Sequence, residues 1–350
     1  MRPKRQEEGR RGPPKRPKSE GARRNGQRAR RSGTSGTRRM AFSGCTLQTR
    51  RRCAVRILVA VDGSFAADRA LDFVAALPWQ EGDRVHVVSV IPSHVEIVGG
   101  PWAIVAPSSA VGSFADVVRI HQDALTKAGR EIRTARADLA IESTLLHGRA
   151  ASMIVEEARR MPADLIVVGH RGAGRWESML LGSVSAEVVD HAPCPVLVAR
   201  DEGLGPVVLA DDRSAYARQA ESVLLDWPMF AGLAVSVVTV VERGESAEVL
   251  GAECDATATR LREAGLDAKA ELREGDAARQ IIAVADARQA NLIVVGTRGQ
   301  TGLRRLMLGS VARNVLLNAP CSVLVVRGGV GVAAASEDHV EEGELVSPFG

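Results

Sequence analysis

Short apolar runs alternate with longer amphipathic stretches over most of this chain. Runs such as LIVV at 165–168 and again at 292–295 have apolar residues at every position. Nearly continuous runs of this kind are typical of strands that are covered on both faces, and therefore of a parallel sheet. Their alternation with helical stretches of about 10–20 residues predicts right-handed crossovers and an α/β fold.

The pattern predicts the same element order twice: strand, helix, strand, helix, strand, helix, strand, helix, strand. Strands are expected near 56–61, 84–91, 141–146, 165–169 and 195–199, and again near 207–210, 233–241, 269–272, 292–296 and 322–326. Helices are expected near 66–76, 115–136, 150–160 and 183–190, and again near 215–225, 246–264, 276–288 and 310–316.

A glycine pattern marks the end of the fourth strand in each half. Three glycines and a serine recur at identical spacing 127 positions apart (296 − 169): Gly169, Gly172, Gly182 and Ser183, then Gly296, Gly299, Gly309 and Ser310. The segment APCPVLV at 192–198 returns as APCSVLV at 319–325 with the same offset, whereas ILVAVDGS at 57–64 matches VVLADDRS at 207–214 with an offset of 150. The first half therefore has about 23 extra residues (150 − 127), which fall within 92–116, in a loop where insertions are well tolerated.

Charge divides the chain unevenly. Residues 1–56 hold 19 Lys and Arg against 3 Glu, so the remainder has 27 basic and 39 acidic residues (46 − 19 and 42 − 3). We expect a disordered basic segment over 1–53, two folded domains over 54–200 and 205–328, and an acidic disordered tail over 329–350. The basic segment is either a tether for nucleic acid or acidic surfaces, or an upstream extension of the gene model with Met40 as the start. Otherwise nucleic acid is not an expected partner.

The five cysteines do not have metal-ligand spacing. Cys194 and Cys321 each precede an apolar run and are interpreted as buried small hydrophobes. The odd count, without a secretory signal or an apolar run long enough to cross a bilayer, predicts a cytoplasmic protein without a membrane partner.

The glycine pattern lies where backbone N–H groups can hold phosphate. Glycine at 169 and 172 would let the backbone approach a ligand and take positive φ, and the helix that opens at Gly182 and Ser183 would favour an anion. Ser183 would cap that helix or bind a phosphate oxygen, beneath a flap over 173–181. The alternative is that these glycines only make turns. Asp62, after the first strand, is either a ligand for ribose, adenine or a metal-bound water, or a residue of the turn before the first helix; both roles are compatible.

Together these motifs resemble the universal stress protein family in its tandem-domain form, over about residues 54–328. The resemblance implies two doubly wound domains, each a five-stranded parallel sheet of order 3-2-1-4-5 flanked by helices, which bind ATP, with or without Mg²⁺. It implies that the domains pack as an intramolecular pseudo-dimer, with further homo-oligomers open. The implied nucleotide-binding residues are Ala60, Asp62, Val90, Val168, Gly169, Gly172, Gly182, Ser183 and Val184, and Ala210, Asp212, Val240, Val295, Gly296, Gly299, Gly309, Ser310 and Val311.

The second domain departs from the pattern beside its carboxylate, where Asp211 and Arg213 replace Val61 and Gly63. An unpaired carboxylate near the base would cost about 1–3 kcal/mol on binding, so we expect weaker binding there. Arg213 could instead hold phosphate or pair with Asp211.

The resemblance implies a regulatory ATP-binding protein of the stress response that acts by conformational change. His147 and His170 are replaced by Glu274 and Thr297 in the second copy, which does not favour a catalytic base, and the chain is not expected to be an enzyme. Two alternatives stay open: a slow ATPase or other nucleotide-processing enzyme on this fold, and a ligand-free dimerisation module.

Overall fold

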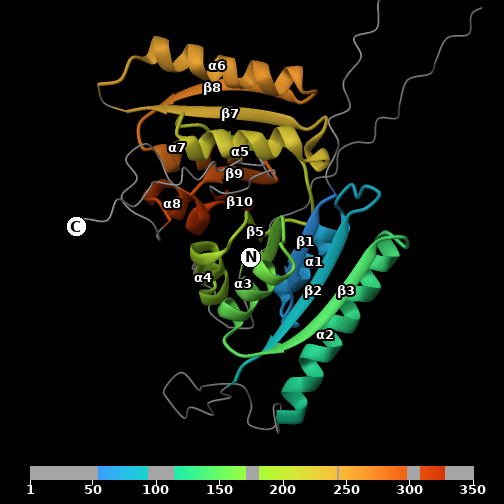
Figure 1. Ribbon diagram of the computed structural model, residues 1–350. Coiled ribbons are helices and arrows are strands. Elements are labelled where there is room, and N and C mark those ends of the chain that lie inside the picture. Colours follow the sequence, from blue (N-terminus) through green and yellow to red (C-terminus); the bar gives the residue numbers. More distant parts are fainter. Residues whose placement is uncertain (1–53, 94–113, 171–180, 243, 298–307, 328–350) are drawn as a thin grey trace, which may run out of the picture. The chain divides into compact units, whose positions relative to one another are not determined.

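A computed structural model describes residues 54–93, 114–170, 181–242, 244–297 and 308–327 (Figure 1). The first repeat comprises β1 (Arg56–Ala60), α1 (Phe65–Ala75), β2 (Arg84–Ile91), α2 (Phe114–Ala135), β3 (Ala140–His147), α3 (Ala150–Arg160), β4 (Leu165–Gly169), α4 (Ser183–His191) and β5 (Val196–Ala199). The second comprises β6 (Val207–Ala210), α5 (Ala215–Asp226), the short 3-10 helix η1 (Pro228–Phe230), β7 (Ala234–Val241), α6 (Ala247–Glu263), β8 (Asp267–Glu274), α7 (Ala277–Ala287), β9 (Leu292–Gly296), α8 (Ser310–Asn318) and β10 (Ser322–Val326).

The described strands form one sheet in the order β3-β2-β1-β4-β5-β10-β9-β6-β7-β8. Each repeat therefore has the expected order 3-2-1-4-5, and its strands are parallel. The repeats meet where β5 pairs antiparallel with β10, with Leu197 opposite Leu324. Antiparallel pairing of two apolar edge strands satisfies backbone groups that would otherwise be exposed.

Two arginines at equivalent positions link the repeats across this junction. Arg200 follows β5 and its guanidinium donates to the carbonyl of Leu316 in α8 at 2.6 Å. Arg327, which is 127 positions later, donates to the carbonyls of Asp190 and Ala192 at the end of α4. Each cation lies at the carboxyl end of the other repeat's helix, where unsatisfied carbonyls and the helix dipole favour positive charge.

Two cysteines lie beside the same junction. Cys194 precedes β5 and Cys321 precedes β10, and both are buried as expected. Burial raises the pKa of each thiol to about 12. At neutral pH these side chains are therefore neutral thiols, with little of the thiolate that reacts.

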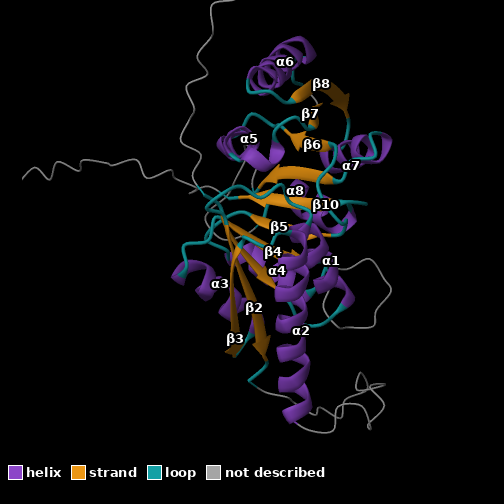
Figure 2. Ribbon diagram, turned by 90° about the vertical axis from the view of Figure 1, so that its right-hand side faces the viewer, coloured by secondary structure: helices purple, strands orange, loops and turns teal. Residues whose placement is uncertain are grey.

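Helices cover both faces of the sheet in each repeat (Figure 2). On one face, residues of α1, α2, α5 and α6 pack against the strands in a single core. On the other face, residues of α3, α4, α7 and α8 form a second core. Alternate residues of a strand point to opposite faces, so Val59 and Val61 enter the first core whereas Leu58 and Ala60 face the second.

The outer strands are less covered than the apolar runs led us to expect. Every residue of β4 and β9 is buried, but β3 and β8 have exposed or half-buried side chains along most of their lengths. Each outer strand has one neighbouring strand. Charged residues such as Glu142 and Glu271 lie on these strands, as is usual where a sheet edge must not pair with another chain.

Several expectations fall outside the described residues: the basic segment, the acidic tail, most of the insertion and most of the flap. Part of the extra length of the first repeat does appear, because α2 has 22 residues and α6 has 17. The element η1 was not expected from the sequence. In the described residues, none of the helices combines the length and the apolar character that crossing a membrane requires.

Gly169 and Gly296 have a packing role that the sequence did not indicate. Each is the last residue of a strand and neither has a positive φ, so the expectation of positive φ at Gly169 is wrong. A Cβ on Gly169 would lie 2.2 Å from the carbonyl oxygen of Ala66 in α1, and one on Gly296 would lie 2.8 Å from the backbone of Tyr216 in α5. Glycine at the strand end lets the first helix of each repeat approach the sheet.

Replacing Gly169 with alanine should destabilise the fold by about 1–3 kcal/mol, because the new methyl group meets backbone that cannot rotate away. Urea unfolding of the full chain, followed by circular dichroism, measures this change. The matched control is Gly251→Ala in α6, where the new Cβ finds only an ordinary contact of 3.8 Å with Leu272; it should stabilise by about 0.5–1 kcal/mol. A Gly169→Ala protein as stable as the wild type would contradict the packing role.

Candidate functional site

The fold brings the described members of the first repeat's predicted nucleotide-binding set to one edge of its sheet. β1 lies between β2 and β4, so Asp62 after β1, Val90 near the end of β2 and Gly169 at the end of β4 meet at the carboxyl edge. The start of α4 is fastened there, because the N–H of Gly182 donates to the carbonyl of His170 at 2.9 Å. Ser185 in the first turn of α4 donates to the carbonyl of Gly169 at 2.6 Å. Ligands of doubly wound folds bind at this edge.

The second repeat has the corresponding arrangement. The N–H of Gly309 donates to the carbonyl of Thr297 at 2.8 Å, which fastens α8 to the end of β9. Seven apolar members of the two predicted sets pack in the core between the sheet and α3, α4, α7 and α8. They are Ala60, Val90 and Val168 in the first repeat and Ala210, Val240, Val295 and Val311 in the second.

The helices that begin at the glycine pattern have no side-chain cap. The N-cap residues of α4 and α8 are Gly182 and Gly309, whereas Ser64 caps α1 and Asp276 caps α7 through side-chain oxygens. Ser183 and Ser310 are the first helical residues, so the expectation that Ser183 caps its helix is wrong. Both serines are exposed, as is Val184.

The first intrahelical hydrogen bond of α4 runs from the N–H of Ala186 to the carbonyl of Gly182, at 2.9 Å. The N–H groups of residues 183–185 precede it and have no acceptor within the helix. In α8 the first such bond runs from Arg313 to Gly309, also at 2.9 Å. Each repeat therefore directs a turn of backbone donors, at the positive end of a helix dipole, toward the ligand edge.

Asp62 also has the turn role that its sequence context suggested. One carboxylate oxygen accepts from the N–H of Ser64 at 3.0 Å, and the Ser64 hydroxyl then accepts from the N–H of Ala67. Asp212 makes the same contact with Ser214 at 3.0 Å. Asp62 is half-buried and Asp212 is exposed.

The residue after each carboxylate has a left-handed backbone. Gly63 has φ +75°, which costs glycine little. Arg213 takes φ +65° at the same place, a conformation that side-chain-bearing residues rarely adopt. Its guanidinium contacts Glu245 at 2.9 Å and Glu253 at 3.3 Å, and these contacts hold the side chain toward α6.

Asp211 lies on the other face of the sheet from the apolar members of the predicted site. It is buried, and its carboxylate oxygens accept from the backbone N–H of Arg213 at 2.8 Å and from the hydroxyl of Thr257 at 2.9 Å. The expectation of an unpaired carboxylate beside the base is therefore wrong. The pairing with Arg213 does exist, but through the backbone rather than the guanidinium.

The Asp211 contacts extend into a network. The guanidinium of Arg260 donates to the Thr257 hydroxyl at 2.8 Å and to buried Glu221 at 2.6 and 3.0 Å. The hydrogen bond to Glu221 raises the pKa of Arg260. We call these four residues, Asp211, Glu221, Thr257 and Arg260, the Asp211 network.

The first repeat fills three of these four places with apolar side chains. Residues Val61 and Leu71 correspond to Asp211 and Glu221 at the offset of 150, and both are buried. The buried positions 121, 128, 129 and 132 of α2 match 250, 257, 258 and 261 of α6 at an offset of 129, so Ala128 corresponds to Thr257. The three polar residues of the second repeat therefore occur together where the first repeat has three apolar ones. Each buried polar group thus has a hydrogen-bonding partner beside it.

A hydroxyl on the second strand anchors the end of β1 and of β6. The Ser89 hydroxyl donates to the carbonyl of Val61 at 2.6 Å. Because this bond uses the only proton of the hydroxyl, Ser89 must accept in its 2.8 Å contact with His121, whose Nδ1–H donates. Burial lowers the pKa of His121, against the opposing effect of Asp62. In the second repeat Thr239 donates to the carbonyl of Asp211 at 2.9 Å.

Some candidate residues are not brought into the site. His147 and Glu274 are exposed at strand ends, as expected for surface positions. Gly172, Gly299, Arg171, Arg298 and Trp176 lie outside the described residues. Among the residues with described positions, three or more His, Cys, Asp or Glu side chains do not gather as a metal would require.

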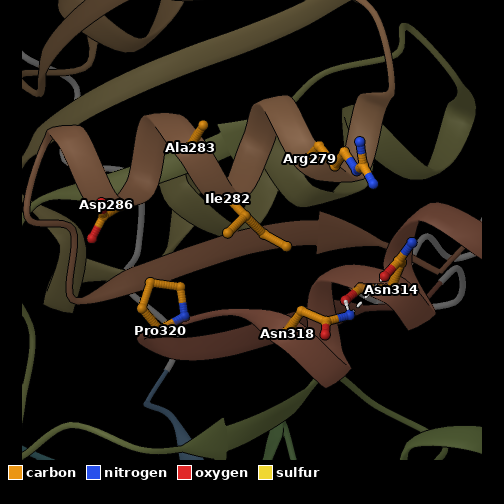
Figure 3. A pocket seen from close by; sticks show the side chains of 7 residues that line it. All are labelled: Arg279, Ile282, Ala283, Asp286, Asn314, Asn318 and Pro320. Carbon is orange, nitrogen blue, oxygen red and sulfur yellow. Dashed lines mark hydrogen bonds between the residues drawn. The ribbon is translucent and has the colours of Figure 1, made fainter.

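A cavity of about 630 Å³ lies elsewhere, between α7 and α8 (Figure 3). None of the seven residues that line it belongs to the predicted nucleotide-binding set. The sequence does not indicate this cavity, because its lining residues form no motif and come together only through the packing of two helices.

Comparison with known proteins identifies a family. The family model described as the universal stress protein family matches residues 55–200 and 206–327. A universal stress protein of Thermus aquaticus is 38% identical over 144 residues, which are 41% of this chain and 97% of that protein. Universal stress protein Mb2028c of Mycobacterium bovis is 26% identical over 77% of this chain and 96% of its own length. The crystal structure of a universal stress protein from Archaeoglobus fulgidus has a TM-score of 0.59 at 19% identity and covers 78% of this chain and 98% of its own.

The Asp211 network predicts a coupled pair of substitutions. Asp211→Val and Thr257→Ala should each destabilise the protein by about 1–3 kcal/mol, because each leaves buried polar groups without a partner. The double variant reproduces the apolar pair of the first repeat and should cost at least about 0.5 kcal/mol less than the sum. Urea unfolding measures all three, with Ser222→Ala on the exposed face of α5 as the control. Strict additivity would show that the two side chains do not act together.

Proposed function

This chain belongs to the universal stress protein family, and we propose that each of its two repeats binds ATP at the carboxyl edge of its sheet. The bound nucleotide acts as a regulatory ligand in the response to stress. The single observation that carries the proposal is the uncapped first turn of α4 and of α8, fastened by a glycine to the end of the fourth strand.

The phosphates have suitable partners in each repeat. Backbone N–H groups at 183–185 and at 310–312 are aligned with a helix dipole, and the neighbouring Ser183 and Ser310 hydroxyls are exposed. The N-cap glycines have φ of −60°, which any residue can adopt. Glycine therefore favours phosphate binding here because it has no side chain, and not because the backbone is unusual. Such a turn binds anions without a catalytic side chain.

The base and ribose have an apolar wall and a carboxylate. Val90 and Val168 are buried in the core behind α3 and α4, and Ala60 at the end of β1 is half-buried. Asp62 uses one oxygen for its turn, and a carboxylate has lone pairs left for ribose hydroxyls or an adenine amine. In the second repeat Asp211 is hydrogen-bonded on the opposite face, so it does not compete with the base for this space.

Regulation rather than turnover is favoured by what the described residues supply. His121 lies close enough to the predicted carboxylate Asp62 for that charge to act on its pKa, but its Nδ1–H is occupied by Ser89. A slow ATPase remains the alternative, and it would need a positioned base that activates water. A bound ligand shifts a conformational equilibrium only by the difference between its affinities for the two conformations.

The two glycine N-caps offer a matched test of ATP binding. Gly182→Val should weaken binding in the first repeat by about 10–150-fold, since it blocks charge-assisted bonds from backbone to phosphate. Gly309→Val should do the same in the second repeat only. Titration calorimetry of the full chain should give two sites for the wild type and one for each variant. The two remaining affinities should agree within about tenfold, because Asp211 carries no desolvation cost.

Each substitution keeps a φ that valine accepts, so the protein should stay folded, with a loss of at most about 1 kcal/mol in unfolding free energy because valine is a poorer N-cap than glycine. Unchanged titrations for both variants would show that phosphate does not meet these helices. Release of ADP during incubation with ATP at a rate that Gly182→Val abolishes would favour the ATPase.

We also propose that the repeats act as one intramolecular pseudo-dimer in solution. Amide hydrogen exchange should then be as slow at 196–198 and 323–325 as in the central strands β1 and β6. Arg200→Met with Arg327→Met should speed exchange at these positions, because the links to the opposite helix ends are lost, while Arg218→Met on the exposed face of α5 should not. Fast exchange of both strands in the wild type would mean that the repeats move independently.

A further inference from the structure

Helix α7 presents a stripe of residues that line the cavity between α7 and α8 (Figure 3). Arg279, Ile282, Ala283 and Asp286 are spaced by three, four and seven positions and therefore share one side of the helix. Ile282 is half-buried and Ala283 is exposed. Arg279 and Asp286 stand about 10.5 Å apart along the helix axis, one at each end of the stripe.

The two charges oppose the dipole of their own helix. Arg279 is the third residue of α7, near its positive end, and Asp286 is the last but one, near its negative end. Helices prefer the reverse arrangement. The equivalent helix of the first repeat, α3, follows the preference, with Arg159 and Arg160 in its last turn.

Neither charge is compensated within the part of the chain that the structure describes. No hydrogen bond or ion pair reaches the side chain of Arg279 or Asp286 from the described residues. The neighbouring charges are committed elsewhere: Arg288 donates to Glu271 at 2.7 Å, and Asp276 caps the helix by accepting from the N–H of Arg279 at 2.9 Å.

The first repeat links its corresponding helices, α3 and α4, through its own side chains. Arg149 before α3 pairs with Glu187 of α4 at 2.9 Å, and Arg159 donates to the carbonyl of His191. At the offset of 127 the second repeat has Asp276, Asn314 and Asp286 at the positions of Arg149, Glu187 and Arg159. The Asn318 side chain turns back onto Asn314 of its own helix. The cross-helix links of the first repeat are thus replaced by residues that leave the second repeat open.

We propose that this stripe of α7 is a dimerisation surface that takes the same stripe of a second copy of the chain, with the two helices antiparallel. A two-fold axis between Ile282 and Ala283, the midpoint of 279 and 286, places Arg279 of each copy opposite Asp286 of the other. The surface is then self-complementary, which is the requirement for an isologous contact.

The contact relieves the charges that α7 cannot satisfy alone. Each Arg279 comes beside the carboxylate and the negative end of the opposite helix, and each Asp286 comes beside the guanidinium and the positive end. Ile282 supplies apolar surface at the axis, and the small side chain of Ala283 lets the helices approach. Exposed ion pairs are weak and are screened by salt, so the dimer is transient and dissociates at high ionic strength.

Sedimentation equilibrium of the full chain at low ionic strength tests this surface by charge exchange. Arg279→Asp and Asp286→Arg should each weaken self-association about tenfold, because each places like charges together twice across the axis. The double variant should return to within about threefold of the wild type, because the pairs form again with their signs reversed. Arg218→Asp on the exposed face of α5, which changes the net charge by the same amount as Arg279→Asp, should leave association unchanged.

Thermal unfolding of every variant should match or exceed that of the wild type, since both reversals suit the dipole of α7. A wild-type chain that is monomeric at about 0.5 mM would overturn the proposal. It would also be overturned if the double variant stayed as weak as the single ones, or if Arg218→Asp weakened association equally. These outcomes do not involve nucleotide, so they are independent of the ATP proposal.

Discussion

The antiparallel pairing of β5 with β10 is the contact on which the arrangement of the two repeats depends. Each repeat would otherwise end in an apolar edge strand with unpaired backbone groups. Because all strands within a repeat are parallel, reversing direction at this one pair sends the carboxyl ends of the two sets to opposite edges of the joined sheet. The two candidate nucleotide sites are therefore kept apart, and a signal from one to the other has to pass through the junction. Arg200 and Arg327 connect that junction to the helices that begin at the glycine patterns.

The two repeats have the same backbone fold, but their buried side chains differ. Where the first repeat has Val61 and Leu71, the second has buried Asp211 and Glu221 together with Thr257. A buried carboxylate without partners would be severely destabilising, but hydrogen bonds to Thr257 and to backbone remove most of that cost. The polar residues lie on the sheet face opposite the apolar members of the predicted site. Divergence of the cores has thus left the ligand edges alike, apart from the Gly63 and Arg213 turn.

Local sequence determined the elements well because buried parallel strands and capped helices have strong local signals. The strands 165–169, 292–296 and 322–326 were predicted with the bounds that the structure has, and the offset of 127 related the two glycine patterns correctly. What local sequence could not reveal depends on distant partners. Thr257 meets Asp211 across 46 positions, and Gly169 is required by the backbone of Ala66, more than 100 positions earlier. The exposed faces of β3 and β8 also follow from their place in the sheet rather than from their composition.

The burial of Cys194 and Cys321 has a practical consequence for the junction. Both thiols stand at the starts of the strands that join the repeats, and burial keeps their pKa at about 12. An alkylating reagent can therefore reach them only when β5 or β10 transiently detaches. The ratio of their labelling rate to the rate of a fully exposed thiol gives the free energy of that local opening, and no substitution in the chain is needed. The same shielding slows the reaction of these two sulfurs with peroxide, because that reaction needs an exposed thiolate.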